Sequence, residues 1–150
     1  MRIIGAVASL PSDDRVQAWD VFRSSHAQVK AEISADLDSE REMQLAWFDV
    51  LHALNNAGGR LRMQDLSATL FMNKSSLTRL VDRIEADGLI SREADPADGR
   101  GTLAALTKLG RERYRSVKPV YLRAIQRHFG APLADTDVAN VQRALTKLVP

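Results

Sequence analysis

Apolar residues recur every three or four positions through most of the chain, a spacing that places them on one face of a helix. The first such stripe begins after Ser12 or Asp13, either of which suits a helix N-cap. Its members are Val16, Trp19, Phe22, His26, Val29, Ile33 and Leu37. The pattern therefore predicts one long helix near the N-terminus.

Three further helical segments are expected before the pattern changes. A stripe over residues 47–54 stops at NNAGG, whose glycines suit a helix C-terminus. A short helix should occupy residues 63–70, followed by the turn FMN. The next helix, capped by Asn73 and ended by Gly88 in a left-handed conformation, turns four apolar residues inward. These are Leu77, Leu80, Val81 and Ile84.

Two short segments, GLISRE and TLAALT, are typical of strands, and the stretch ADPADGRG separates them. Thr107 then caps a long helix, which Pro119 should kink or divide in two. After GAPLADTD a last helix carries Val138, Val141, Leu145 and Leu148. The expected order is four helices, one β-hairpin and two or more helices.

Composition narrows the class of protein. A chain of 150 residues, 45% hydrophobic and 27% charged, suits one globular domain. The absence of cysteine excludes disulfides, thiolate metal sites and thiol redox sensing, and it is compatible with a cytoplasmic protein. No apolar run is long enough to span a membrane. The N-terminal MRIIGAVASL is expected to be an apolar arm that packs on a partner or on the core, with a cleaved signal as the alternative.

Charge is distributed unevenly along the chain. Residues 1–42 carry five basic and eight acidic side chains, whereas residues 43–150 carry sixteen basic and eleven acidic ones. The second part is therefore suited to an anionic partner.

Two short helices joined by a tight turn and followed by a hairpin describe a winged helix-turn-helix. In NKSSLTRLVDRIEADGLI the apolar residues share one face, and the rest are small or basic toward the N-terminus. Arg79 has the geometry to bond a guanine through both O6 and N7. The alternative is an ordinary amphipathic helix with a solvated polar face. The predicted DNA contacts of this helix are Lys74, Ser75, Ser76, Thr78, Arg79 and Arg83.

The stretch LTRLVDRIEADGLISREADPADGRGTLAALTKLG resembles the MarR family of bacterial transcriptional regulators. The family's pattern reads RLVDRLE..GL..R, then DP.D.R, then LT..G, and the likeness extends over roughly residues 16–148. It implies a mainly α fold with a small β-hairpin wing, as a single domain over residues 1–150. A winged helix-turn-helix lobe would occupy residues 44–110. Residues 10–38 and 111–149 would form a helical dimerisation region, giving a homodimer that binds a palindromic DNA operator.

The resemblance also assigns roles to the wing. Arg100 would enter the minor groove, attracted by the negative potential of an A·T-rich stretch. Asp98 would either hold that guanidinium in place or form the turn itself. Arg92 would contact phosphate, as would Arg60 and Arg62 from the start of the third helix, the alternative for all three being a solvated surface role.

Regulators of this family usually sense small aromatic compounds in a pocket between the dimer helices and the lobe. The aromatic residues available on the first two helices are Trp19, His26, Trp47, Phe48 and His52. Such a pocket needs aromatic surface and a few polar groups, although ordinary core or interface packing explains each residue equally well. We therefore expect a phenolic or aromatic carboxylate ligand to weaken DNA binding.

Other chemistry finds no support in the sequence. His26, His52 and His128 lack the close spacing of a metal site, and no cofactor-binding loop or nucleophile–base pattern occurs. The sequence thus predicts no enzyme, no metal and no cofactor. It favours a ligand-responsive, sequence-specific transcriptional repressor. The alternative is a protein-interaction module that keeps the winged-helix shape without binding DNA.

Overall fold

The structure, a computed structural model, describes residues 9–41 and 43–149. The expectations for the N-terminal arm concern mostly residues outside this part. The prediction of a mainly helical chain with an antiparallel wing is confirmed. In chain order the elements are α1 (Asp13–Arg41), α2 (Leu45–Asn56), β1 (Arg60–Arg62), α3 (Met63–Thr69), α4 (Lys74–Ala86), β2 (Ile90–Ala94), β3 (Thr102–Leu106), α5 (Lys108–Ile125), a π-helical turn (Gln126–Gly130), α6 (Asp135–Leu145) and a 3-10 turn (Thr146–Leu148).

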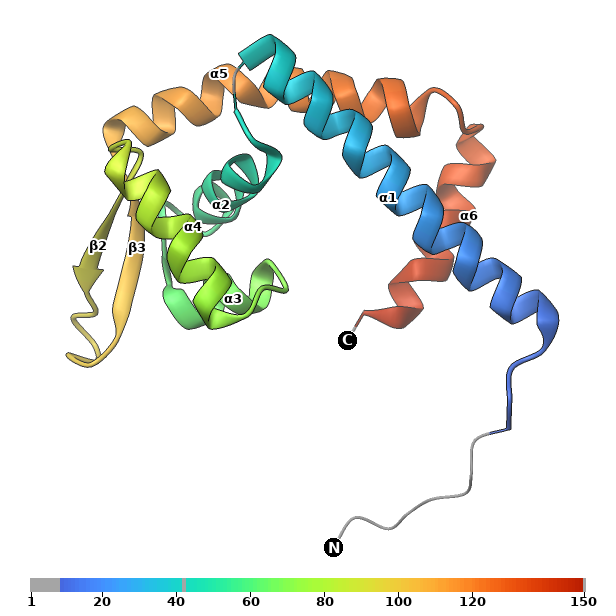
Figure 1. The fold of residues 1–150 in the computed structure, drawn as a ribbon, viewed down its shortest axis with the longest axis horizontal. Coiled ribbons are helices and arrows are strands. Elements are labelled where there is room, and N and C mark those ends of the chain that lie inside the picture. The colour runs from blue at the N-terminus through green and yellow to red at the C-terminus, as the bar shows by residue number, and fades with distance from the viewer. Residues whose placement is uncertain (1–8, 42, 150) are drawn as a thin grey trace, which may run out of the picture.

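The elements fall into a lobe and a set of helical arms (Figure 1). We use "lobe" for residues 44–110, which contain α2, the wing sheet, α3 and α4. We use "arms" for α1, the C-terminal part of α5 and α6. Helix α5 starts at the lobe and runs across to α1, and α6 lies at the end of the molecule away from the lobe (Figure 1). Among the described residues, no helix combines the length and apolarity that crossing a membrane requires.

Both ends of α4 lie where the sequence predicted them, at the N-cap Asn73 and at Gly88. The Asn73 side chain accepts a hydrogen bond from the Ser76 N–H at 2.8 Å, as an N-cap does. At the other end of α4, Gly88 has φ of +76°, and the Leu89 N–H donates to the Ile84 carbonyl at 3.2 Å. This is a Schellman ending, which glycine adopts without steric cost.

The wing has three strands, whereas the sequence predicted a two-stranded hairpin. Strand β1 pairs antiparallel with β3, and the sheet order is β1-β3-β2. Arg60 and Arg62 therefore lie on this strand. Arg62 is also the N-cap residue of α3, as its predicted place at the start of the third helix requires, whereas Arg60 lies two residues earlier on the strand. The strand was missed because it has only three residues with a single apolar member, Leu61, too few for an alternating pattern to show.

Helix α5 passes Pro119 without a break, so the division into two helices, one of the two outcomes predicted for this proline, does not occur. Val117 and Val120, on either side of it, are buried and hold the helix against its neighbours. The α-helical pattern is interrupted later, at the π-helical turn, where the Ala131 N–H donates to the Gln126 carbonyl at 2.7 Å. Tertiary packing thus outweighs the local cost of the proline.

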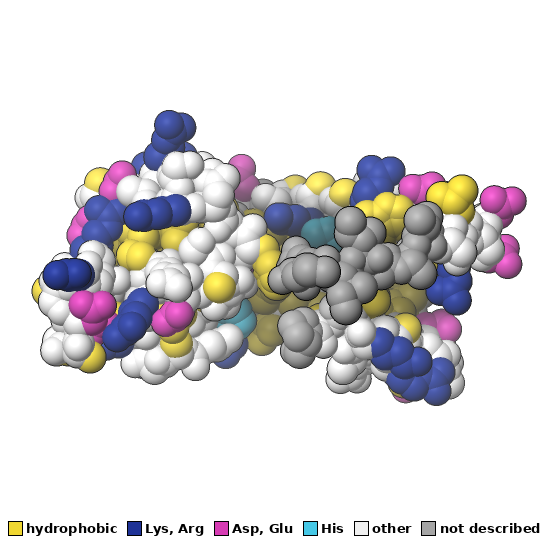
Figure 2. All heavy atoms as spheres, turned by 90° about the horizontal axis from the view of Figure 1, so that it is seen from below, with side chains coloured by type: hydrophobic (Ala, Val, Ile, Leu, Met, Phe, Trp, Pro, Cys, Tyr) yellow, Lys and Arg dark blue, Asp and Glu magenta, His cyan; other side chains and the backbone are white. Residues whose placement is uncertain are grey.

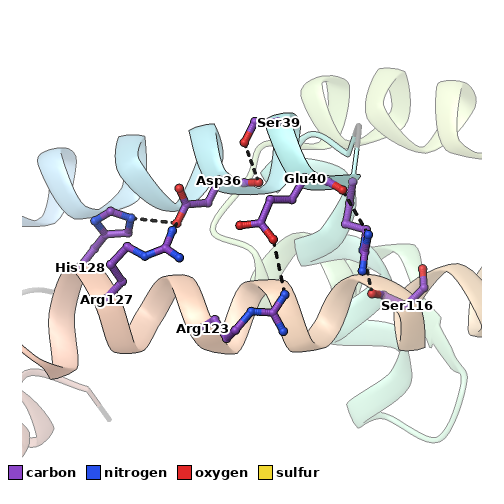
Figure 3. Close-up of polar contacts among 8 residues, drawn as sticks. Asp36, Ser39, Glu40, Ser116, Arg123, Arg127 and His128 are labelled. Atoms are coloured by element: carbon purple, nitrogen blue, oxygen red, sulfur yellow. Dashed lines mark hydrogen bonds and ion pairs between the residues drawn. The ribbon is translucent and has the colours of Figure 1, made fainter.

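Polar contacts fasten α1 to α5 and to the π-helical turn (Figure 3). One oxygen of Asp36 accepts hydrogen bonds from Arg127 Nη1 at 2.8 Å and His128 Nε2 at 2.9 Å. One turn along, Glu40 meets Arg123 at 3.4 Å. Two consecutive residues therefore reach the same carboxylate, and the arms are held together by charge as well as by apolar packing.

Candidate nucleic-acid interface

Helix α4 has the two faces that the sequence predicted. Leu77, Leu80, Val81 and Ile84 are buried in the lobe core. The opposite face exposes Lys74, Ser75, Ser76, Thr78, Arg79 and Arg83. Within the described part of the chain, the cationic groups of Lys74, Arg79 and Arg83 form no ion pair with a carboxylate. Their charges are therefore available to an anionic partner.

A hollow of about 650 Å³ lies between the start of α4, the start of α3 and the wing. Six of the predicted DNA contacts line it: Arg62, Lys74, Thr78, Arg92, Asp98 and Arg100. The others lie outside its lining: Ser75, Ser76, Arg79 and Arg83 on the exposed face of α4, and Arg60 on β1, where it pairs with Glu93 at 3.6 Å. Lys and Arg side chains are spread over the lobe on the side that Figure 2 views.

The tip of the wing is closed by its own hydrogen bonds. The Asp95 N–H donates to the Gly101 carbonyl at 2.9 Å, and the Gly101 N–H donates to the Asp98 carbonyl at 2.8 Å. The Asp98 carboxylate accepts from the Arg100 backbone N–H at 3.1 Å, which is the turn-forming role left open by the sequence. The Arg100 guanidinium itself makes no ion pair within the described residues. The tip thus presents a free cation on an ordered backbone.

Asp95 lies turned inward at the base of this tip, with only 5% of its surface exposed. Its Oδ2 contacts Arg62 Nε at 2.6 Å, and its Oδ1 accepts from the Ala97 N–H at 2.9 Å. Oδ2 has no hydrogen bond of regular geometry, so the charge of Arg62 is what compensates it. This arrangement explains how an acid is tolerated beside a surface suited to a polyanion, and it joins β1 to the wing.

Arg92 is fully engaged within the lobe. Its guanidinium forms ion pairs with Asp82 and, at 3.3 Å, with Glu85. The backbone N–H of Arg92 also donates a hydrogen bond to the Glu85 carboxylate at 3.0 Å. These bonds tie β2 to α4. Sequence reasoning assigned Arg92 to phosphate and missed its two acidic partners, although both belong to the RLVDRIE motif that the chain shares with the MarR pattern.

The predicted ligand residues divide into two separate groups. Phe48 and His52 stack at 5.6 Å between ring centroids, and Tyr121 lies 4.4 Å from Phe48. Trp19 and His26 instead flank Phe22 on α1, at 6.0 and 6.5 Å. No ring contact joins the groups in the described part of the chain.

Trp47 is half-buried, and its indole N–H has no partner. Sequence reasoning missed Tyr114 and Tyr121, which α5 brings to Phe48 from far along the chain.

His52 is held as a neutral ring. Asn56 Nδ2 donates to its Nε2 at 3.2 Å, so Nδ1 carries the hydrogen and donates to the Tyr114 hydroxyl at 2.9 Å. Burial lowers the pKa of His52, and the positive charge of Lys118 lowers it further, against the opposing effect of Asp49.

A hollow of about 390 Å³ adjoins His52, Asp49 and Asn56. Burial raises the pKa of Asp49, while the nearby positive charge of Lys30 acts in the opposite direction. The hollow thus combines apolar lining from Leu61 and Leu70 with a few polar groups.

A family model described as the MarR family matches residues 42–101, which is nearly the whole of the lobe. The chain is 32% identical over 82 residues to the uncharacterized HTH-type transcriptional regulator YkoM of Bacillus subtilis, covering 55% of this chain and 53% of that protein. The chain thus aligns with about half the length of the curated relatives it matches.

Solved structures extend the likeness to nearly the entire chain. AbsC, a MarR family transcriptional regulator from Streptomyces coelicolor, is 28% identical with a TM-score of 0.84, over 94% of this chain and 95% of its own. Sco3205 from the same organism, solved in complex with DNA, is 21% identical with a TM-score of 0.85, over 96% and 91%. The organohalide-sensing regulator RdhR, solved with 2,4-dichlorophenol, is 18% identical with a TM-score of 0.76, over 97% and 88%.

These proteins are regulators of transcription, in agreement with the expectation that the chain is not an enzyme. The lobe matches the family in sequence, and the lobe and arms together match it in structure. Residues 42–101 are therefore a MarR-family winged helix-turn-helix lobe, and the chain as a whole has the fold of the MarR family transcriptional regulators.

Proposed function

We propose that this protein is a dimeric, sequence-specific DNA-binding repressor of the cytoplasm. It binds a palindromic operator through α4 and the wing, and a small aromatic or phenolic compound releases it. The observation that carries the proposal is the hollow between α4 and the wing, with free cations around it.

The recognition helix supplies base contacts. Ser75, Ser76 and Thr78 are small enough to let the start of α4 approach the major groove, and Asn73 leaves the remaining first N–H groups for phosphate. Arg79, one turn in, then bonds guanine. Arg92 and Arg62 act mainly by positioning, since carboxylates already hold both.

The wing adds a contact in the neighbouring minor groove. Arg100 stands beyond the strands on a tip fixed by hydrogen bonds, so less conformational entropy is lost when it inserts. A narrow A·T-rich groove attracts its charge.

Two copies are needed to read a palindrome. Helix α1 leaves Trp19, Phe22 and Val16 exposed on its apolar stripe, a surface suited to a second copy. Paired lobes would then meet half-sites about 34–36 Å apart, one turn of DNA.

The aromatic group around Phe48 and His52 is the proposed ligand site. It joins α2 of the lobe to α5 of the arms, so a compound bound there would shift one against the other. RdhR, a protein of the same fold, was solved with a phenolic compound. Trp47 offers an unused indole N–H nearby on α2, while Trp19 and His26 reach the site only if a second copy brings them there.

The test of DNA binding begins with selection of bound fragments from genomic DNA, followed by affinity measurements on the selected site. Arg79→Ala should weaken binding by about 1–3 kcal/mol and relax preference at one base pair. Arg100→Ala should weaken binding and reduce the preference for A·T-rich flanks. Arg143→Ala, an exposed arginine on α6, is the control and should change neither.

Salt dependence separates this function from an interaction module that does not bind DNA. The logarithm of the binding constant should fall with the logarithm of salt by about 0.9 per phosphate neutralised. Selection that enriches no sequence, or affinity indifferent to salt, would overturn the proposal.

Ligand control is tested by calorimetry and operator release across phenols and aromatic carboxylates. Binding should be lost on Phe48→Ala. If no compound in such a panel binds or releases DNA, the ligand part of the proposal is wrong while the DNA-binding part stands.

A further inference from the structure

The first half of α5 carries a row of cations that the DNA-binding face does not use. Lys108, Arg111, Arg115 and Lys118 follow one another at steps of three, four and three residues. This spacing places them along one face of the helix, and all four are exposed. We call this row the α5 stripe.

The stripe differs from other basic side chains of the molecule, because the arginines that contact α1 or the wing mostly form ion pairs with carboxylates. Arg123 and Arg127 bind Glu40 and Asp36, and Arg62 binds Asp95. Lys108, Arg111 and Arg115, by contrast, make no ion pair or side-chain hydrogen bond within the described residues. Lys118 lies 5.7 Å from the centre of the Tyr114 ring.

Helix stability does not explain the row. The amino end of a helix carries a partial positive charge and favours acids, yet the first turn of α5 contains none. Lys108 and Arg111 lie in or beside that turn and oppose the helix dipole. Cations placed against this preference indicate a role outside the folding of the helix.

The stripe also lies away from the operator-binding side. Helix α5 begins at the base of β3, at the end of the lobe opposite the wing tip and the start of α4 (Figure 1). A straight duplex seated on α4 and the wing tip therefore does not reach it.

Given the proposed operator binding, on which this inference rests, we propose that the α5 stripe binds the phosphate backbone of a second segment of double-stranded DNA. Its four cations span about 15 Å of helix, at 1.5 Å per residue. One DNA strand presents a negative charge about every 3.4 Å along its axis, so a row of this length faces several phosphates. The row contains no hydroxyl or amide side chain among its four members, which suits backbone binding without base recognition.

A protein held on its operator would thereby bridge to a neighbouring duplex or to a bent flank. The bound segment would be chosen by proximity instead of sequence. Affinity at the stripe would depend strongly on salt, whereas operator choice would remain with α4.

The experiment immobilises a short operator duplex, loads the protein, and measures capture of a labelled duplex of unrelated sequence. The variant is the triple replacement Lys108→Gln, Arg111→Gln and Arg115→Gln, which spares Lys118 because it lies beside Tyr114. The matched control removes the same charge elsewhere, by Arg15→Gln, Arg143→Gln and Lys147→Gln.

The wild type and the control should capture the second duplex, with affinity falling steeply as salt rises. The stripe variant should lose capture on the order of 100-fold near 0.1 M salt, as expected for three phosphate contacts, and keep its operator affinity. Equal capture by variant and wild type overturns the inference. So does the absence of capture by the wild type, a result that would favour an acidic protein surface as the partner.

Failure of the proposed operator binding is recognised separately, since the wild type would then not load on the short duplex. Direct binding of the unrelated duplex by wild type and variant then decides the matter. A weaker variant supports the stripe, and equal binding rejects it.

Discussion

The lobe and the arms both contain amphipathic helices, yet they differ in how much of each apolar face is buried within a single chain. In the lobe, α2 buries six of its 12 residues and α4 buries Leu77, Leu80, Val81 and Ile84. Helix α1, with 29 residues, buries only Ile33 and Leu37, and α6 buries none. A hydrophobic stripe therefore indicates that one face of a helix packs against another surface. It does not indicate whether that surface belongs to the same chain or to another one.

This difference also divides stability from assembly. The lobe should owe its stability to contacts within the chain, and the arms should gain theirs when a second copy covers Trp19, Phe22 and their neighbours. Changes at five positions test the two regions and the contact between them.

The largest effect is expected inside the lobe, at Gly110. A Cβ at this position would lie 1.9 Å from the Leu89 carbonyl oxygen, a backbone atom that cannot move aside. Gly110→Ala should therefore lower the free energy of unfolding by about 3 kcal/mol or more, measured by urea denaturation. Gly99→Ala, which meets nothing within 4 Å, is the control. Similar stability of the two variants would contradict the close approach.

A change on the arm should affect assembly and leave the lobe folded. Trp19→Glu places a charge on the apolar stripe of α1 and should weaken dimerisation by about 2–4 kcal/mol, followed by analytical ultracentrifugation. Gln17→Glu adds the same residue on the opposite side of the helix and should leave the dimer intact. If Trp19→Glu unfolds the lobe, the two regions are not separable.

Phe71 tests whether the lobe contains a strained backbone position that lowers its stability. This residue, in the turn between α3 and α4, has φ of +52° and is 94% exposed. A side chain in this conformation is strained, so Phe71→Gly should raise stability by about 0.5–1 kcal/mol, seen as a higher Tm. Phe71→Ala keeps a Cβ and should gain nothing. Equal Tm values for the two variants would mean that the backbone is not strained there.

The smallest effect concerns His52, at the seam between lobe and arm. Its lowered pKa means that the folded protein binds this proton less readily than the unfolded chain, whose histidine titrates near 6.5. The stabilisation is therefore complete above pH 6.5 and is lost as pH falls through the lowered value. Unfolding measured between pH 5 and 7 should show this slope, and His52→Gln should flatten it.

Asp49 acts with the opposite sign. Its pKa is raised above 3.8, so its contribution is complete at low pH and is lost as pH rises through the raised value. Asp49→Asn should consequently steepen the loss of stability that occurs as pH falls. If the free energy of unfolding depends on pH identically in wild type and His52→Gln, protonation of His52 does not affect stability.

Much of the fold could be predicted because its signals are local. The caps at Asn73 and Thr107 and the left-handed Gly88 depend on a few neighbouring residues, and all three occur as expected. Strand β1 could not be predicted from its own three residues, since its partner β3 lies more than forty positions away.

The candidate site shows the same limit. The exposed face of α4 follows from helical spacing, so its residues were found. The pairing of Arg92 with Asp82 and Glu85, and of Arg62 with Asp95, depends on how the wing folds back on the lobe. For the same reason the place of Tyr114 and Tyr121 beside Phe48 was not predicted, since both come from α5, more than sixty positions further along the chain.

The π-helical turn at Gln126–Gly130 has a consequence for how this chain can vary. An α-helix advances about 100° per residue, so deleting one residue there would turn the residues that follow within the turn by about that angle. Arg127 and His128 would then lose their register with the Asp36 carboxylate on α1. Residues 131–134, which are not helical, separate this turn from α6 and can absorb part of the change. A change in the length of the turn should therefore disturb the attachment of α1 more than the direction of α6.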